Sequence, residues 1–276
     1  MSRISRRFAD LREHGRAGLI TFLTAGDPDM ATFETVLAGL PASGADLIEV
    51  GVPFSDPMAD GPAIQAAGLR ALKGGTKLRH ILAAVARFRQ IDGETPIILM
   101  GYYNPIFHFG IASFTKEAAA AGVDGLIIVD LPPEESDEFR PAATAAKLEL
   151  IRLTAPTSDD ARLPKVLKGA GGFVYHVAIA GITGTRSASI ADVQPVVERI
   201  RRHTSLPVAI GFGIRTPDQA AATAEIADAV VVGSALVETV ASNLDAEGQA
   251  GPGLVMALHT QVAALAAGVR RVARGK

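Results

Sequence analysis

Short apolar segments, each followed by a segment of helical periodicity, recur eight times along this chain of 276 residues. The apolar segments are near-continuous runs such as LIIVD and AVVVG, which are typical of strands that are buried on both faces and therefore parallel. Strict alternation of strand and helix, repeated eight times in about 250 residues, predicts a TIM-type (β/α)8 barrel. The predicted strands are 19–23, 46–51, 96–100, 125–129, 148–153, 172–177, 207–210 and 227–232.

The whole chain, residues 1–276, is expected to form one barrel domain with an extra helix at 3–13, before the first strand. A doubly wound open sheet is the main alternative. No Gly-x-Gly-x-x-Gly turn follows the first strand, which counts against the dinucleotide-binding version of that sheet. The other predicted helices are 30–43, two within 62–91, 111–121, 134–146, 159–168, 190–202, 216–224, a short one before 248, and 254–272.

Composition excludes several classes of function. The net charge of −2 gives no electrostatic reason to expect nucleic acid or a membrane surface as the main partner. The absence of cysteine excludes disulfides and thiolate chemistry. Neither a signal peptide nor an apolar run of membrane-spanning length is present, so a cytoplasmic location is expected. His108, His176 and His203 lack the spacing of metal ligands, and no metal site is predicted.

One acidic residue, Glu49, interrupts the second apolar segment. A charge inside such a strand is costly to bury unless it is paired, neutralised or used in chemistry. Leu47, Glu49 and Gly51 share one face of the strand, and Ile48 and Val50 share the other. If Ile48 and Val50 face the helices, Glu49 points into the barrel mouth, where desolvation raises its pKa toward neutrality. The alternative is a structural glutamate held by a neighbouring backbone group or base.

A second carboxylate, Asp60, lies in the loop after this strand, directly before Gly61 and Pro62. Two acids at the exit of one strand are what a proton-transfer site needs. The alternative for Asp60 is a helix N-cap, with Pro62 in the first turn of the helix. We interpret Glu49 and Asp60 as the catalytic pair.

Glycine-rich segments follow three late strands, at 181–186, 211–213 and 233–234. Glycine allows the backbone to approach an anion closely, and the N–H groups of a following helix turn point toward it. Barrels often bind phosphate after strands seven and eight. A phosphate site is therefore predicted, with backbone amides supplying most of the contacts.

Segments spread over almost the whole chain resemble, in order, the motifs of the tryptophan synthase alpha subunit family. The most specific is EVGVPFSDPMADGPAIQ at 49–65. The others are LTAGDPD (23–29), MGYYNPI (100–106), IIVDLPPEE (127–135), TAPTS (154–158), GITGTR (181–186), GFGIRTP (211–217) and VVVGSALV (230–237).

The resemblance implies a retro-aldol cleavage of indole-3-glycerol phosphate to indole and glyceraldehyde 3-phosphate, in tryptophan biosynthesis. Glu49 would be the acid/base and Asp60 would accept the indole N–H. No cofactor is implied, because the protonated ring is the electron sink. The implied substrate-binding residues are Phe22, Met100, Ile127, Tyr175, Thr183, Gly184, Phe212, Gly213, Gly233 and Ser234.

The family also implies a partner, the tryptophan synthase beta subunit, in a complex of two alpha and two beta chains. Two alternatives share part of this interpretation. One is a stand-alone lyase that releases indole without a partner. The other is a non-catalytic regulatory subunit, against which the presence of both Glu49 and Asp60 argues. The residues implied near the partner are Pro53, Phe54, Asp56, Asn104 and Pro132.

Overall fold

A computed structural model describes residues 1–178, 190–211 and 213–274 of the chain. Its strands are all parallel and belong to one sheet. The strands are β1 (Gly18–Thr24), β2 (Leu47–Gly51), β3 (Ile97–Gly101), β4 (Gly125–Ile128), β5 (Glu149–Leu150), β6 (Arg152–Thr154), β7 (Val174–Val177), β8 (Val208–Gly211) and β9 (Ala229–Val232).

The sheet closes on itself at Ile151. The strand order begins with β5 and ends with β6, and Ile151 alone separates these two strands in the chain. β5 pairs with β4 and β6 pairs with β7, so one continuous segment joins both ends of the sheet. The Ile151 N–H donates to the Leu126 carbonyl at 3.0 Å. The predicted barrel is confirmed, and the alternative of an open sheet is wrong.

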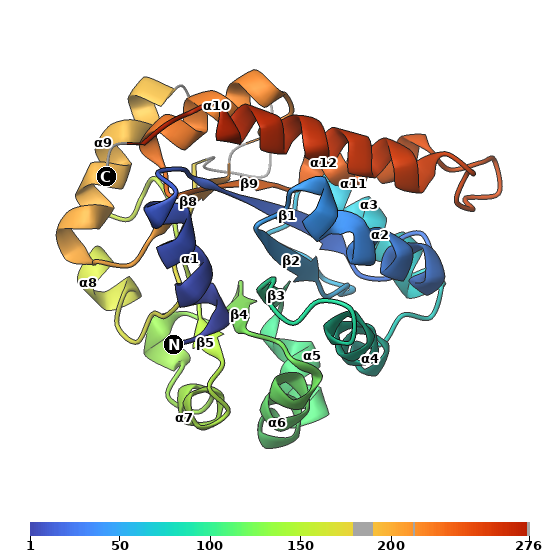
Figure 1. The fold of residues 1–276 in the computed structure, drawn as a ribbon. Coiled ribbons are helices and arrows are strands. Elements are labelled where there is room, and N and C mark those ends of the chain that lie inside the picture. Colours follow the sequence, from blue (N-terminus) through green and yellow to red (C-terminus); the bar gives the residue numbers. More distant parts are fainter. Residues whose placement is uncertain (179–189, 212, 275–276) are drawn as a thin grey trace.

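The helices after α1 lie outside the strands, and α12 runs beside α2 and α10 (Figure 1). The helices of the described chain are α1 (Arg3–Glu13), α2 (Met30–Ser43), α3 (Pro62–Lys73), α4 (Leu78–Arg89), α5 (Tyr103–Phe109), α6 (Ile111–Ala121), the 3₁₀ turn η1 (Pro133–Glu135), α7 (Arg140–Ala145), α8 (Leu163–Val166), α9 (Ile190–His203), α10 (Pro217–Ile226), α11 (Ser234–Ser242) and α12 (Leu254–Arg270).

Three helix predictions differ from the structure. The predicted helix at 134–146 is η1 followed by the shorter α7, and the one at 159–168 contains only α8. α8 begins at Leu163 with Pro164 in its first turn, where a missing N–H leaves no helical hydrogen bond unmade. α5 was not predicted, and it contains Pro105 in its first turn. Proline in a first turn removes no N–H that the helix needs, and α5 therefore accommodates it.

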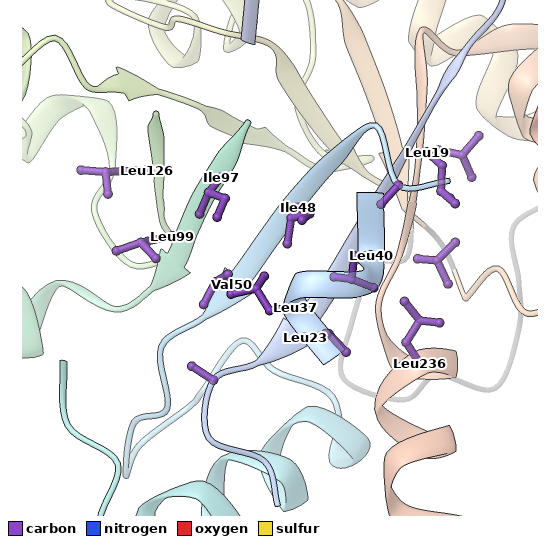
Figure 2. Close-up of a cluster of buried hydrophobic side chains, with 14 of the residues drawn as sticks. Leu19, Leu23, Leu37, Leu40, Ile48, Val50, Ile97, Leu99, Leu126 and Leu236 are labelled. Carbon is purple, nitrogen blue, oxygen red and sulfur yellow. The ribbon is translucent and has the colours of Figure 1, made fainter. Parts of the chain in front are cut away.

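The two faces of β2 are used as the sequence predicted. Ile48 and Val50 belong to the large apolar cluster between strands and helices, which also contains Leu37 and Leu40 of α2 (Figure 2). Leu47 belongs instead to the cluster inside the barrel. Since side chains alternate along a strand, Glu49 lies on the interior face with Leu47.

The extra N-terminal helix is also confirmed. The buried residues of α1 are Ile4, Phe8 and Leu11, and all three belong to the interior cluster. The Phe8 ring lies 5.7 Å from the ring of Phe173, measured between centroids. α1 therefore packs against the barrel interior (Figure 1). Because α1 precedes β1, it meets the interior at the N-terminal ends of the strands and leaves their C-terminal ends for a site.

Candidate active site

Glu49 is completely buried and its carboxyl group is isolated. Its exposed fraction is 0%, and neither carboxyl oxygen has a hydrogen-bond partner among the described residues. Burial raises the pKa of Glu49 from 4.5 to about 8. No described base or backbone group holds this side chain, so the alternative of a structural glutamate has no support in the structure. The carboxyl group is instead protonated at neutral pH and able to give its proton away.

The surroundings of Glu49 explain its desolvation. In the sheet register it lies between Phe22 of β1 and Ile98 of β3, both buried. Burial, and to a smaller extent the charge of the nearby Glu49, raise the pKa of Tyr175 of β7 well above its ordinary value. Tyr175 also packs against the interior cluster. Glu49 is therefore flanked by apolar and aromatic side chains, which explains its desolvation.

The raised pKa makes stability depend on pH. Between pH 4.5 and about 8 the folded chain keeps a proton on Glu49 that the unfolded chain has released. The free energy of unfolding therefore decreases as the pH rises through this window, by roughly 3 kcal/mol between pH 4.5 and pH 7. Glu49→Gln removes this decrease. In urea denaturation, the free energy of unfolding of the variant should increase relative to that of the wild type from pH 5 to pH 8. A difference between the two that does not change with pH would contradict the raised pKa of Glu49.

Asp60 is not the N-cap of α3. The capping position is Gly61, with no side-chain cap, and Pro62 opens the helix. Burial instead raises the pKa of the Asp60 carboxyl group from 3.8 to about 6, and the nearby Tyr102 hydroxyl lowers this pKa by a smaller amount. Tyr102 in turn accepts a hydrogen bond from the Ala59 N–H at 3.0 Å, which fixes the loop that carries Asp60.

A pocket lies between the C-terminal ends of β1, β2 and β3 and the helix α3. Gly51, two residues after Glu49 on the same face, lines it, as does Phe22, which pairs with Glu49 in the sheet. Asp60 also lines this pocket. Its full lining is Phe22, Thr24, Gly51, Val52, Pro53, Phe54, Pro57, Asp60, Ile64, Gln65, Gly68, Met100, Gly101, Tyr102 and Val129.

Only some of the other predicted binding residues line this pocket. Phe22 and Met100 line it, while Ile127 and Tyr175 belong to or pack against the interior cluster. The predictions for Thr183, Gly184 and Phe212 lie outside the described residues. The structure therefore places Phe22 and Met100 in the pocket wall with Asp60, and Ile127 and Tyr175 in the barrel interior.

The remaining predicted residues lie after β8 and β9. Gly213 has a φ of +66°, a conformation that favours glycine. Gly233 is the N-cap of α11 and Ser234 its first residue, and no side chain caps this helix end. Its first N–H groups are therefore available to an anion.

Sequence reasoning missed two polar residues of the pocket. The Tyr102 hydroxyl lies near the Asp60 carboxyl group, and Gln65 donates to the Asp60 carbonyl at 2.9 Å. Their only signal was position, because each lies inside one of the motif segments quoted above. Thr24, the polar residue at the end of the first predicted strand, also lines the pocket; it is 4% exposed, and its hydroxyl has no hydrogen-bond partner in the described part of the chain.

The described residues contain no group of three or more His, Cys, Asp or Glu side chains arranged to hold a metal ion. No helix among them has the length and hydropathy to cross a membrane.

The barrel carries a buried carboxyl group with a pKa of about 8 on the interior face of β2, and a second one with a pKa of about 6 in the wall of the pocket beyond the C-terminal end of that strand. Carboxyl groups with such separated pKa values at the C-terminal end of a barrel are typical of an enzyme. The family model for the tryptophan synthase alpha chain matches residues 8–265. The chain belongs to this family, and it is a lyase of tryptophan biosynthesis that cleaves indole-3-glycerol phosphate.

Individual relatives agree with this assignment. The tryptophan synthase alpha chain of Acidiphilium cryptum (strain JF-5) is 56% identical over 270 residues, 98% of each chain. The tryptophan synthase alpha subunit of Legionella pneumophila str. Paris has a TM-score of 0.90 at 34% identity, over 99% of this chain and 100% of that one. A structure of Mycobacterium tuberculosis tryptophan synthase has a TM-score of 0.87 at 39% identity, over 98% of both chains.

Proposed function

We propose that Glu49 and Asp60 carry the cleavage of indole-3-glycerol phosphate into indole and glyceraldehyde 3-phosphate. The observation that supports this most strongly is the state of Glu49, a buried, unpartnered carboxyl group with a pKa of about 8. It lies on the interior face of β2, and the wall of the pocket beyond the C-terminal end of that strand holds a second carboxylate with a pKa of about 6. At neutral pH the first is an acid and the second an anion.

In the proposed mechanism, Glu49 first gives its proton to C3 of the indole ring. Positive charge then develops on the ring nitrogen, and Asp60 stabilises it by accepting the N–H. The Glu49 carboxylate next takes the proton of the side-chain hydroxyl group. The C3–C3′ bond breaks as the carbonyl of glyceraldehyde 3-phosphate forms, and its electron pair restores the aromatic ring. Glu49 ends in its starting protonation state.

The proposed binding mode follows from the arrangement of side chains. Phe22 and Met100 give the pocket apolar walls that suit a flat aromatic ring. The open N-terminus of α11, at Gly233 and Ser234, offers backbone N–H groups and a helix dipole to the phosphate. We assign Gly213 to the same phosphate site, and Tyr175 and Ile127 to the floor near the glycerol chain and ring.

We also propose that a tryptophan synthase beta subunit binds the rim of this pocket. Phe54 and Pro53 line the pocket, and the Phe54 ring lies 5.3 Å from that of Tyr102, whose hydroxyl group lies near Asp60. Asp56 lies in the same loop and Asn104 lies on α5, next to the turn that carries Pro132. A partner that presses on this rim therefore acts on Asp60 through Tyr102.

The decisive experiment is an assay of indole release from indole-3-glycerol phosphate by the purified chain, with and without a beta subunit. We expect release by the chain alone and faster release with the partner. Absence of indole under both conditions would contradict the proposed assignment of the site.

The rate should have a bell-shaped dependence on pH. kcat/KM reports the free enzyme, in which Asp60 must be ionised and Glu49 protonated. It should rise as pH increases through about 6, where Asp60 loses its proton, and fall as pH increases through about 8, where Glu49 does. Steady-state assays from pH 5 to pH 10 measure both limbs. Asp60→Asn should flatten the acid limb only, and a profile without an alkaline limb would exclude Glu49 as the acid.

A further inference from the structure

The pocket contains space that no side chain of the described residues fills, at Gly68 in the middle of α3. Gly68 is buried and lines the pocket. A Cβ atom built on it meets no heavy atom within 4 Å. Its neighbour Ala67 is 0% exposed and packs with Phe22 and Val237. α3 is therefore tightly packed at Ala67 and open at Gly68.

This free space is continuous with the site of Asp60. Ile64, Gln65 and Gly68 lie on one face of α3, since residues three and four apart are neighbours on a helix. All three line the pocket together with Asp60, which lies just before the helix. The face of α3 that begins at the catalytic aspartate therefore leads along the pocket wall to Gly68.

Helix stability gives no reason for glycine at this position. Glycine in a helix interior is less favourable than alanine. The positive φ values that require glycine occur elsewhere in the described chain, and Gly68 is not among them. A methyl group would fit without a clash when the pocket is empty. The free space beside Gly68 can affect the enzyme only when a bound ligand occupies it.

We propose that Gly68 determines specificity by leaving room for a substituent at C7 of the indole ring, so that the enzyme cleaves 7-substituted indole-3-glycerol phosphates. This rests on the proposed function, in which Asp60 accepts the indole N–H. C7 lies on the ring edge that carries the N–H, and a substituent there extends past Asp60 along α3. C5 lies on the opposite edge of the ring and points away from this space.

The test compares three substrates: the unsubstituted compound and its 7-methyl and 5-methyl derivatives. Each is assayed with the wild type, Gly68→Ala and Gly68→Val. For the wild type, kcat/KM with the 7-methyl substrate should be within about threefold of the unsubstituted value. Gly68→Ala should lower the ratio of 7-methyl to unsubstituted kcat/KM severalfold, and Gly68→Val about tenfold or more, because one methyl group of lost space discriminates on this scale.

The design separates space from folding. Alanine favours a helix more than glycine, and valine less than alanine, so an effect through helix stability would not follow side-chain size. The 5-methyl ratio should stay unchanged in both variants. The proposal would be overturned if Gly68→Val left the ratio of 7-methyl to unsubstituted kcat/KM unchanged. It would also be overturned if the wild type cleaved the unsubstituted and 5-methyl substrates but not the 7-methyl substrate. Failure of the wild type to cleave even the unsubstituted compound would instead overturn the proposed function.

Discussion

Glu49→Gln should lower kcat for indole release by about 10³-fold, a typical loss when a positioned proton donor is removed. Glutamine has the same shape and cannot give a proton to C3 or take one from the hydroxyl group. The site around Glu49 is closed, so no described side chain can replace it. Indole release with saturating substrate measures the effect. KM should change little, because Glu49 acts on the reacting bonds.

The matched control is Glu149→Gln. Glu149 begins β5, so it lies toward the end of the barrel away from the pocket, and only part of it is buried. This variant should keep wild-type activity. Retention of more than a tenth of the wild-type rate by Glu49→Gln, with the control unaffected, would remove Glu49 from the mechanism.

Asp60→Asn should lower kcat by about 10²- to 10³-fold, the range found when one preorganised group that stabilises developing charge is removed. Asparagine keeps the shape and can still accept a hydrogen bond, but it carries no negative charge to face the developing positive charge on the ring. The Tyr102 hydroxyl, which lies near Asp60, would face the asparagine side chain in the same way. The loss should therefore appear in kcat much more than in KM.

Asp56→Asn is the control for this variant. Asp56 lies in the same loop, is exposed, and accepts a hydrogen bond from Ser55 at 2.9 Å. Its replacement should leave the rate of the chain without a partner unchanged. If Asp56→Asn and Asp60→Asn reduced that rate equally, the effect would belong to the loop and not to the Asp60 carboxylate.

Much of this fold could be predicted from the sequence because its strands are buried on both faces. Continuous apolar runs can pair only with parallel neighbours that are covered by helices. The two-residue period of a strand then predicted that Ile48 and Val50 face the helices and that Glu49 faces the interior. The two apolar clusters, outside and inside the strands, confirm this prediction. Glu49 stood out because it is the one charge within that apolar strand.

The features that could not be predicted depend on contacts between segments that are distant in the chain. Tyr102 reaches Asp60 from the neighbouring strand end, a pairing that the spacing of the two residues does not encode. α5 escaped prediction because Pro105 is compatible with both a turn and a first helical turn. The free space at Gly68 cannot be predicted from the sequence, because a glycine in a helix shows only that a side chain is absent and not whether a neighbouring residue fills its place. Such features require coordinates.

The proposed mechanism requires above all that Glu49 holds a proton near neutral pH. Infrared difference spectra of wild type against Glu49→Gln, recorded from pH 4 to pH 10, would isolate the carbonyl stretch of its protonated carboxyl group. If Glu49 is the acid, this band should disappear as the pH rises, with a midpoint at a pH of about 8. A midpoint near the ordinary value of 4.5 would contradict it.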